Sequence, residues 1–186
     1  MPDIGRRGFV KGATLGALAF TVGGTEVLMA PGEARARNVP FRLLDAHQGE
    51  TLEALGETVV PQARESGIAH FIDQQLSVPP QEALLQARLL NIRPPFADFY
   101  RTALKTIDER SRKIFGRDFA QLSAADQHEF VDRMRQNKVE DWTGPSGALV
   151  YAALRADAVD VVYGTMEGYE ALGIPYMPHI PPEKRW

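Results

Sequence analysis

The chain has 186 residues, with 21 Lys and Arg against 24 Asp and Glu, so its formal net charge is −3. This length suits one ordinary domain, and the mildly acidic balance argues against a nucleic-acid-binding protein, which would need a clustered basic surface. The absence of cysteine excludes disulfides, thiolate nucleophiles, cysteine-ligated iron–sulfur clusters and CxxCH haem attachment. Any redox cofactor must therefore be held in another way or by a partner.

The first 36 residues have the features of a twin-arginine export signal. The residues that match the motif R-R-x-F-[LV]-K are Arg6, Arg7, Phe9 and Lys11. An apolar stretch over residues 13–24 follows, which is too short and too rich in glycine for a membrane-spanning helix. Ala34 and Ala36 then provide an A-x-A site. We predict a signal over residues 1–36 that is cleaved after Ala36; its retention as an anchor, or a basic tail before a buried helix, is the alternative.

The rest of the chain has the apolar spacing, caps and proline breaks of helices. We predict helices over residues 46–60, 67–76, 81–90, 96–115, 124–136 and 147–163. No stretch shows sustained alternation of apolar and polar residues, so no strand is predicted. The last of these helices is apolar nearly all round, which is typical of a central helix or of one buried against another protein. The predicted fold class is all-α, a single irregular bundle of about six helices over residues 37–173.

Residues 174–186 are predicted to form an extended, proline-rich C-terminal tail. Four prolines in the last twelve residues exclude a helix, yet the segment carries large apolar side chains. Such a strip must lie on its own domain or in a groove of a partner, and the sequence leaves both open. The candidate residues for a partner interface are Trp142, Tyr163, Tyr169, Ile174, Tyr176, Met177, Ile180 and Trp186.

The sequence contains no recognisable catalytic constellation. Its four histidines form no i,i+4 pair and no E-x-x-H motif, which argues against a di-iron or zinc site. We interpret His70 as a residue at the edge of the core and His128 as a surface residue. Acidic pairs such as Asp108 and Glu109 are interpreted as solvated helix faces. We therefore predict no catalytic residue, no metal and no cofactor in this chain.

Several segments, taken in order, resemble the gluconate 2-dehydrogenase subunit 3 family, the small γ subunits of bacterial membrane-associated flavin dehydrogenases. They are the export signal, TLEALGETVVP at 51–61, GIAHFIDQQLS at 67–77, FGRDFAQLSAADQHEF at 115–130 and VVYGTMEGYEALGIPY at 161–176. The chain departs from the family at residues 65–67, where Glu-Ser-Gly stands in place of the usual Pro-Gly-Ala. It also has Glu-Gly-Tyr at 167–169, where many members have Gly-Asn and Trp.

The resemblance implies a non-catalytic role. Subunits of this kind bind a large FAD-containing catalytic subunit that oxidises a sugar, polyol or sugar acid, and they act as folding partners that carry its twin-arginine signal. The complex often includes a multihaem cytochrome c, so that FAD, haem c and any iron–sulfur cluster would lie in partner subunits. The resemblance thus implies a periplasmic protein, associated with the inner membrane through the complex and exported by the twin-arginine translocase. A free-standing periplasmic helical ligand-binding protein or a small enzyme is the alternative.

Overall fold

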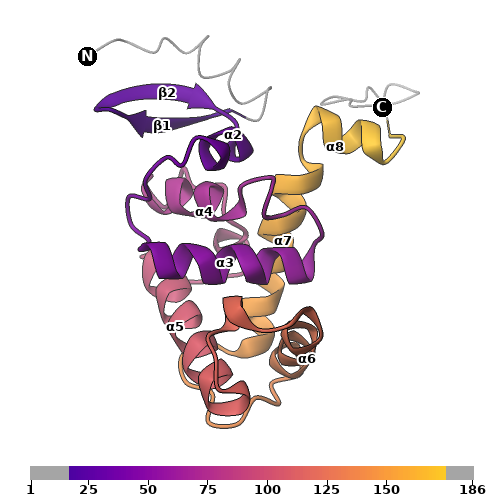
Figure 1. The fold of residues 1–186 in the computed structure, drawn as a ribbon. Helices are drawn as coiled ribbons and strands as arrows, with labels where there is room; N and C mark the ends of the chain where they lie inside the picture. The colour runs from indigo at the N-terminus through magenta and orange to yellow at the C-terminus, as the bar shows by residue number, and fades with distance from the viewer. Residues whose placement is uncertain (1–16, 175–186) are drawn as a thin grey trace, which may run out of the picture.

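The computed structural model describes residues 17–174 (Figure 1). Within this range there are seven α-helices, two 3₁₀ turns and one two-stranded hairpin, which confirms the all-α class. The elements are β1 (Leu18–Val22), β2 (Thr25–Met29), α2 (Pro31–Ala36), α3 (Ala46–Val59), α4 (Ile68–Leu76), η1 (Gln86–Arg88), α5 (Phe96–Phe115), η2 (Phe119–Gln121), α6 (Ala124–Arg135), α7 (Gly147–Tyr163) and α8 (Met166–Ala171).

Five of the six predicted helices are confirmed, and local capping sets their ends. Asp45 and Gln48 form a reciprocal capping box at the start of α3, with the Asp45 carboxylate accepting from the Gln48 N–H at 2.7 Å. Ser123 and Ser146 cap α6 and α7 with a one-way bond, in which the hydroxyl oxygen accepts from the backbone N–H of Asp126 and of Leu149. Gly116 ends α5 with a φ of 78°, a left-handed conformation that favours glycine.

The predicted helix over residues 81–90 is wrong, because these residues form a loop with only the short η1 turn. Burial alternates from Ala83 to Ala87, the pattern of an extended chain, so that Leu84 points outward between two buried neighbours. The backbone N–H of Leu84 donates to the Gln75 side chain at 2.7 Å, and that of Gln86 donates to Asp157 at 2.8 Å. Side chains of α4 and α7 therefore accept from backbone N–H groups that, in a helix, would donate to carbonyls of the same helix.

The expectation of no strand is wrong for residues 18–29. β1 and β2 pair antiparallel from Leu18 opposite Met29 to Val22 opposite Thr25. Gly23 and Gly24 join them, and both have positive φ values, as a two-residue hairpin turn requires. The glycines that made this stretch a poor membrane helix are thus turn residues in the fold.

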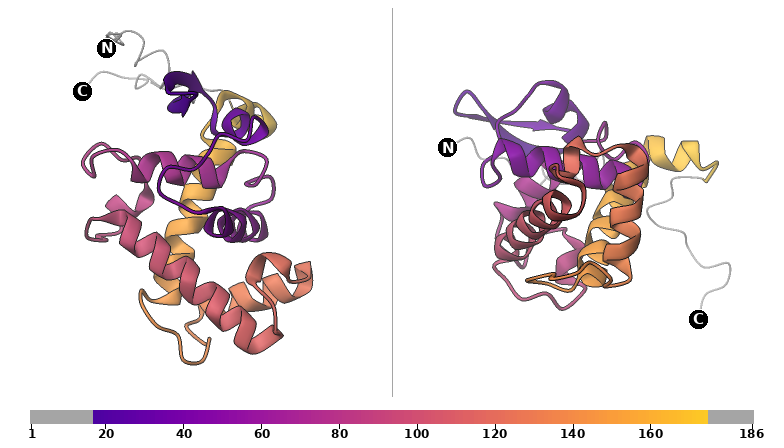
Figure 2. Two further views of the ribbon diagram at one scale, coloured as in Figure 1. Left: turned by 60° about the vertical axis from the view of Figure 1, so that its left-hand side comes forward. Right: turned by 60° about the horizontal axis from the view of Figure 1, so that its bottom comes forward.

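The core is organised around α4 and α7. Every residue from Ile68 to Gln75 is buried, and α4 packs against β1, α2, α3 and α7. α7 also packs against α5, α6, α8 and η1, and it follows the length of the bundle behind α5 (Figure 2). Of the two alternatives that the sequence left for the apolar helix over residues 147–163, the structure shows the central position within the domain. No helix among residues 17–174 is long and apolar enough to span a membrane.

Candidate functional site

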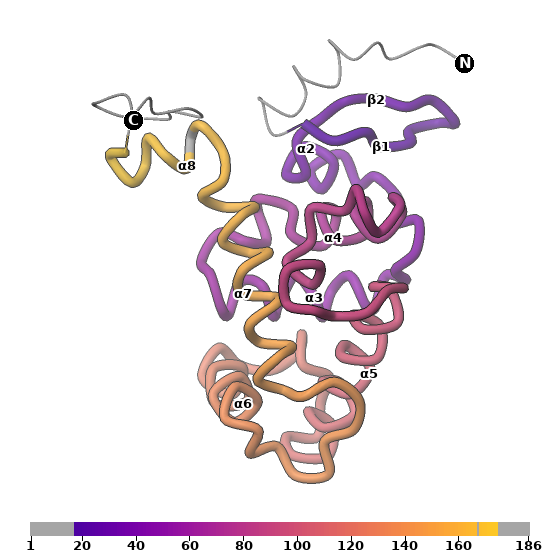
Figure 3. Tube along the Cα trace, turned by 180° about the vertical axis from the view of Figure 1, so that it is seen from behind, coloured from indigo at the N-terminus to yellow at the C-terminus, as the bar shows by residue number. Residues whose placement is uncertain are grey.

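Apolar side chains that have no place in the core gather on the loop that joins α4 to α5. This loop, residues 77–95, is called the leucine loop here. Leu84 and Leu89 are the two most exposed large apolar side chains of residues 17–174, at 60% and 69%, and Leu90 is 37% exposed. Through η1 the loop packs against α7, and Figure 3 shows it beside that helix.

A second group of exposed apolar side chains lies where α7 ends and α8 begins. Met166, Leu172 and Ile174 are between 43% and 52% exposed. Tyr163, the last residue of α7, is partly buried and packs against the core. The name α7 face is used here for the two groups together, because both lie on segments that pack against α7; its members are Leu84, Leu89, Leu90, Met166, Leu172 and Ile174, with the partly buried Tyr163.

Buried polar groups hold the leucine loop on α7. The Asp157 carboxylate, which is fully buried, accepts from the backbone N–H of Gln86 at 2.8 Å and from the Tyr100 hydroxyl at 2.5 Å. The Gln86 side chain also donates to Asp160 at 2.5 Å. The loop is therefore fixed by one main-chain and one side-chain bond to a single turn of helix, directly beside its exposed leucines.

Burial changes the ionisation of this pair. Burial raises the pKa of Asp157 to about 6, although the hydrogen bonds from Tyr100 and Gln86 oppose the shift. Burial, and then the charge of Asp157, raise the pKa of Tyr100 well above its ordinary value. Tyr100 therefore remains a hydrogen-bond donor at neutral pH, and Asp157 is the group of this pair that titrates there.

The structure divides the predicted interface residues between two places. Tyr163, Tyr169 and Ile174 lie at the C-terminal end of α7 and on the segment after it. Trp142 precedes the N-terminal end of α7, about 24 Å away along a helix of 17 residues, and its indole N–H donates to the Pro145 carbonyl at 2.6 Å. Four further candidates, Tyr176, Met177, Ile180 and Trp186, and the motif residues Arg6, Arg7, Phe9 and Lys11 lie outside the described residues.

A second cluster, of charged side chains, joins α3 to α5, and here one interpretation from the sequence is wrong. Asp108 is not solvated: it is 2% exposed and accepts from the Thr51 hydroxyl at 2.8 Å and the Phe119 N–H at 3.1 Å. Burial raises its pKa, while these two hydrogen bonds oppose that shift. His47 lies 3.1 Å from the same carboxylate. The role of Asp108 is to join α3, α5 and η2.

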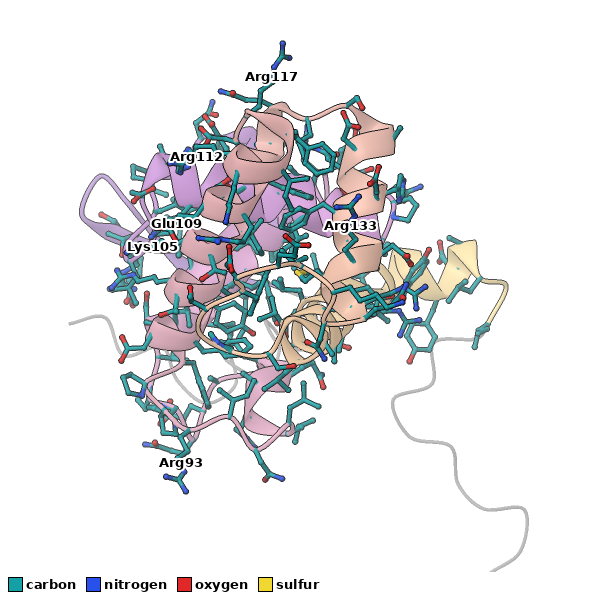
Figure 4. The ribbon with its side chains drawn as sticks, turned by 90° about the horizontal axis from the view of Figure 1, so that it is seen from below. Arg93, Lys105, Glu109, Arg112, Arg117 and Arg133 are labelled. Atoms are coloured by element: carbon teal, nitrogen blue, oxygen red, sulfur yellow. The ribbon has the colours of Figure 1, made fainter. Side chains whose placement is uncertain are left out.

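The same cluster has the composition of a possible metal site. Ligand atoms of His47, Asp108 and Asp118 lie within 4.8 Å of one another in the part of the chain that the structure describes. However, Arg112 pairs with Asp118 at 2.5 Å, and it lines the adjoining cavity of about 340 Å³ together with two further cations, Arg101 and Lys105. Figure 4 shows Lys105 and Arg112 on α5. Three positive charges oppose a bound cation, so we assign the cluster to an ion-pair network.

The two histidines singled out from the sequence lie where they were predicted. His128 is exposed on α6. His70 is 6% exposed, and its Nε2 lies 3.0 Å from the Val39 carbonyl oxygen. Burial lowers the pKa of His70, so this ring is neutral at pH 7. It acts as a packing and hydrogen-bonding residue between α4 and the segment before α3.

Sequence reasoning missed the exposed leucines and the buried carboxylates. The prediction of a helix over residues 81–90 did not reveal the loop that presents these leucines. The signal that could have found Asp157 is its position: an acidic residue in the middle of a helix that is otherwise apolar all round must be paired or neutral. The same argument applies to Asp73 on α4, which is 4% exposed.

Comparison with known families identifies the chain. The family model described as gluconate 2-dehydrogenase subunit 3 matches residues 46–181, which is more than half of the sequence, and the chain therefore belongs to this family. The match begins at the first residue of α3 and includes the leucine loop, α7 and α8. No protein of curated function and no solved structure matches the chain.

Proposed function

We propose that this member of the gluconate 2-dehydrogenase subunit 3 family is the non-catalytic small subunit of a periplasmic dehydrogenase complex. The catalytic partner carries FAD and oxidises a sugar, polyol or sugar acid. A multihaem cytochrome c is a further partner, and haem c and any iron–sulfur cluster lie in the partner chains. The subunit itself has no activity and holds no cofactor.

The observation that carries this proposal is the family match over residues 46–181. Membership supports an accessory subunit of a dehydrogenase, and the composition is consistent with that role. A chain without cysteine cannot hold an iron–sulfur cluster or a CxxCH-attached haem, so such centres belong to other subunits.

The α7 face is the proposed contact with the catalytic subunit. Protein interfaces have an apolar centre, and a stable one buries about 800 Å² on each partner. Leu84 and Leu89 are the most exposed large apolar side chains of this face, and they stand on a loop already fixed by Asp157 and Gln75. A loop that is ordered before binding loses less entropy when the partner docks.

Export is the second part of the proposal. The paired arginines at positions 6 and 7 would direct the chain to the twin-arginine translocase, which carries folded proteins. A small chain without a cofactor has little need of that route. We therefore propose that the signal serves the catalytic subunit, which binds in the cytoplasm, crosses together with this chain and stays at the inner membrane as part of the complex.

Co-expression with the catalytic subunit tests the proposed contact. The variant Leu84→Glu/Leu89→Glu should lower the amount of catalytic subunit that co-purifies by at least about tenfold, because two charges would be buried in an apolar contact. The control is Ile114→Glu on α5, which places one such charge, in place of two, on another exposed apolar position, 36% exposed and outside the α7 face. Both variants should keep the far-ultraviolet circular dichroism of the parent chain.

Two results would contradict parts of this proposal. Wild-type recovery of the catalytic subunit with the Leu84/Leu89 variant would exclude the leucine loop from the contact. A purified chain that is a stable monomer and holds one mole of flavin, metal or another ligand would instead favour a free-standing binding protein or small enzyme.

A further inference from the structure

The segment that the sequence assigns to the export signal is built into the fold from residue 17 onward. Phe20, Met29, Ala34 and Val39 form an apolar cluster in which each side chain is at most 6% exposed. β1 and α2 both pack against α4, the most deeply buried helix. Figure 1 shows the hairpin and α2 stacked on α4 at one end of the bundle. This part of the fold precedes residue 46, where the family match begins.

Two glycines allow α2 to approach the turn before α4 at backbone distance. Gly67 has a φ of 82°, and a Cβ added there would lie 2.2 Å from the Pro31 carbonyl oxygen. A Cβ added to Gly32 would lie 2.8 Å from the Glu65 carbonyl oxygen. Any side chain at either glycine would collide with the facing backbone, so the two glycines permit α2 to pack in this position.

Polar contacts fix the end of α2. Arg35 donates two bonds to the Glu53 carboxylate, at 2.9 and 3.4 Å, and Glu53 is only partly exposed. Asn38 adopts a left-handed φ of 51°, and the Val39 N–H returns to the Ala34 carbonyl at 3.0 Å. This is a closed helix C-terminus, in which the carbonyls of the last turn have partners.

From this geometry we infer that residues 17–36 remain part of the exported protein and that the Ala36–Arg37 bond is not a processing site. A peptidase that recognises A-x-A must bind both alanines in an extended chain. Ala34 is instead helical and has no exposed surface. Cleavage would require α2 to unwind and leave α4, uncovering the apolar cluster and separating Arg35 from Glu53. This inference rests on the proposed export, and it selects retention of the segment over the cleavage expected from the sequence.

The first test is the N-terminus of the chain recovered from the periplasm in complex with its partner. Intact mass should place that terminus at or before residue 17. The variant Gly67→Ala should expose the site and produce chains that begin at Arg37, because the new methyl group displaces Pro31. Gly116→Ala is the matched control, since it has nearly the same φ of 78° but no atom within 4 Å of the added Cβ; its terminus should match that of the parent.

The second test does not depend on export or on a variant. Hydrogen exchange of the purified full-length chain should show the amides of residues 18–29 and of Val39 protected at least about a hundredfold over an unstructured chain. A periplasmic parent chain that begins at Arg37, or fast exchange throughout residues 18–39, would overturn the inference. If the chain does not reach the periplasm, the export proposal fails, and hydrogen exchange alone then decides whether the segment is built into the domain.

Discussion

Asp157 makes the stability of this protein depend on pH in a direction that can be derived. Its pKa in the folded chain is about 6, above the ordinary value of 3.8, because burial disfavours the charged carboxylate. Between these two values the folded state binds more protons than the unfolded state. The contribution of Asp157 to the free energy of unfolding is therefore fully present below about pH 4 and is lost as the pH rises through 6.

The size of this effect follows from the two pKa values. The difference between the two pKa values corresponds to about 3 kcal/mol in the free energy of unfolding, because each pKa unit is worth about 1.4 kcal/mol. Full burial of Asp157 means that solvent does little to screen the effect. A loss of this size is a large part of the roughly 5–15 kcal/mol that holds a typical domain folded.

Asp157→Asn removes the titration and keeps much of the geometry. The Asn carbonyl oxygen can still accept from the Gln86 N–H, and its amide can donate to the Tyr100 hydroxyl oxygen. We expect the free energy of unfolding of the variant to vary less between pH 4.5 and 7.5 than that of the parent, by about 2 kcal/mol, because part of the full difference lies below pH 4.5. Urea denaturation followed by circular dichroism at several pH values measures this difference.

The control is Asp160→Asn, one turn away on α7. Asp160 also bonds Gln86 but is exposed, and its charge is the smallest of the causes that act on the pKa of Asp157, so neutralising it should leave most of the pH dependence of the parent in place. If Asp157→Asn and the parent show the same slope of stability against pH, the reasoning from burial is refuted. If Asp160→Asn removes the slope of stability against pH, the group responsible for that slope is Asp160 and not Asp157.

Three further predictions concern the fold, the signal and the tail. Asp73→Ala should lower the free energy of unfolding by about 3 kcal/mol, measured by urea denaturation, because it leaves the N–H groups of residues 42–44 without the carboxylate that accepts them at 2.7–2.8 Å; an unchanged midpoint would contradict this. Replacing Arg6 and Arg7 by Lys should keep both subunits in the cytoplasm on fractionation, and a partner that still reaches the periplasm would show that it has its own signal. Truncation after Gly173 should leave the melting temperature unchanged but lower the recovery of active complex; earlier melting would place the tail on its own domain.

Local chemistry explains which elements could be predicted from the sequence. α5 begins and ends at the predicted residues because prolines precede it and Gly116 follows it, and both signals act within a few residues of the helix end. α3, α6 and α7 have side-chain caps that can be recognised in the same way. Caps and apolar spacing are short-range features, so an isolated sequence contains them in full.

The leucine loop and Asp108, both mispredicted, depend on groups from other elements of the fold. The leucine loop is extended because Gln75 and Asp157, 9 and 71 residues from their bonding partners, accept its backbone N–H groups. Asp108 is buried because Thr51 and Phe119 converge on it from α3 and η2. The sequence of one helix shows that such a carboxylate is present. The hydrogen-bond donors that offset the cost of burying it come from other elements, so the helix alone does not reveal them.

The polar side chains of α4 connect these observations. A helix that is buried on all sides should be apolar, yet α4 contains His70, Asp73 and Gln75. Each of them bonds the backbone of a segment that has no regular structure: Val39, residues 42–44 and Leu84. Their burial is stable because every bond replaces one that the irregular backbone would have made to water. One helix therefore holds both the segment between α2 and α3 and the loop that presents Leu84 and Leu89. This explains how a small domain can hold a loop with exposed leucines in a fixed position.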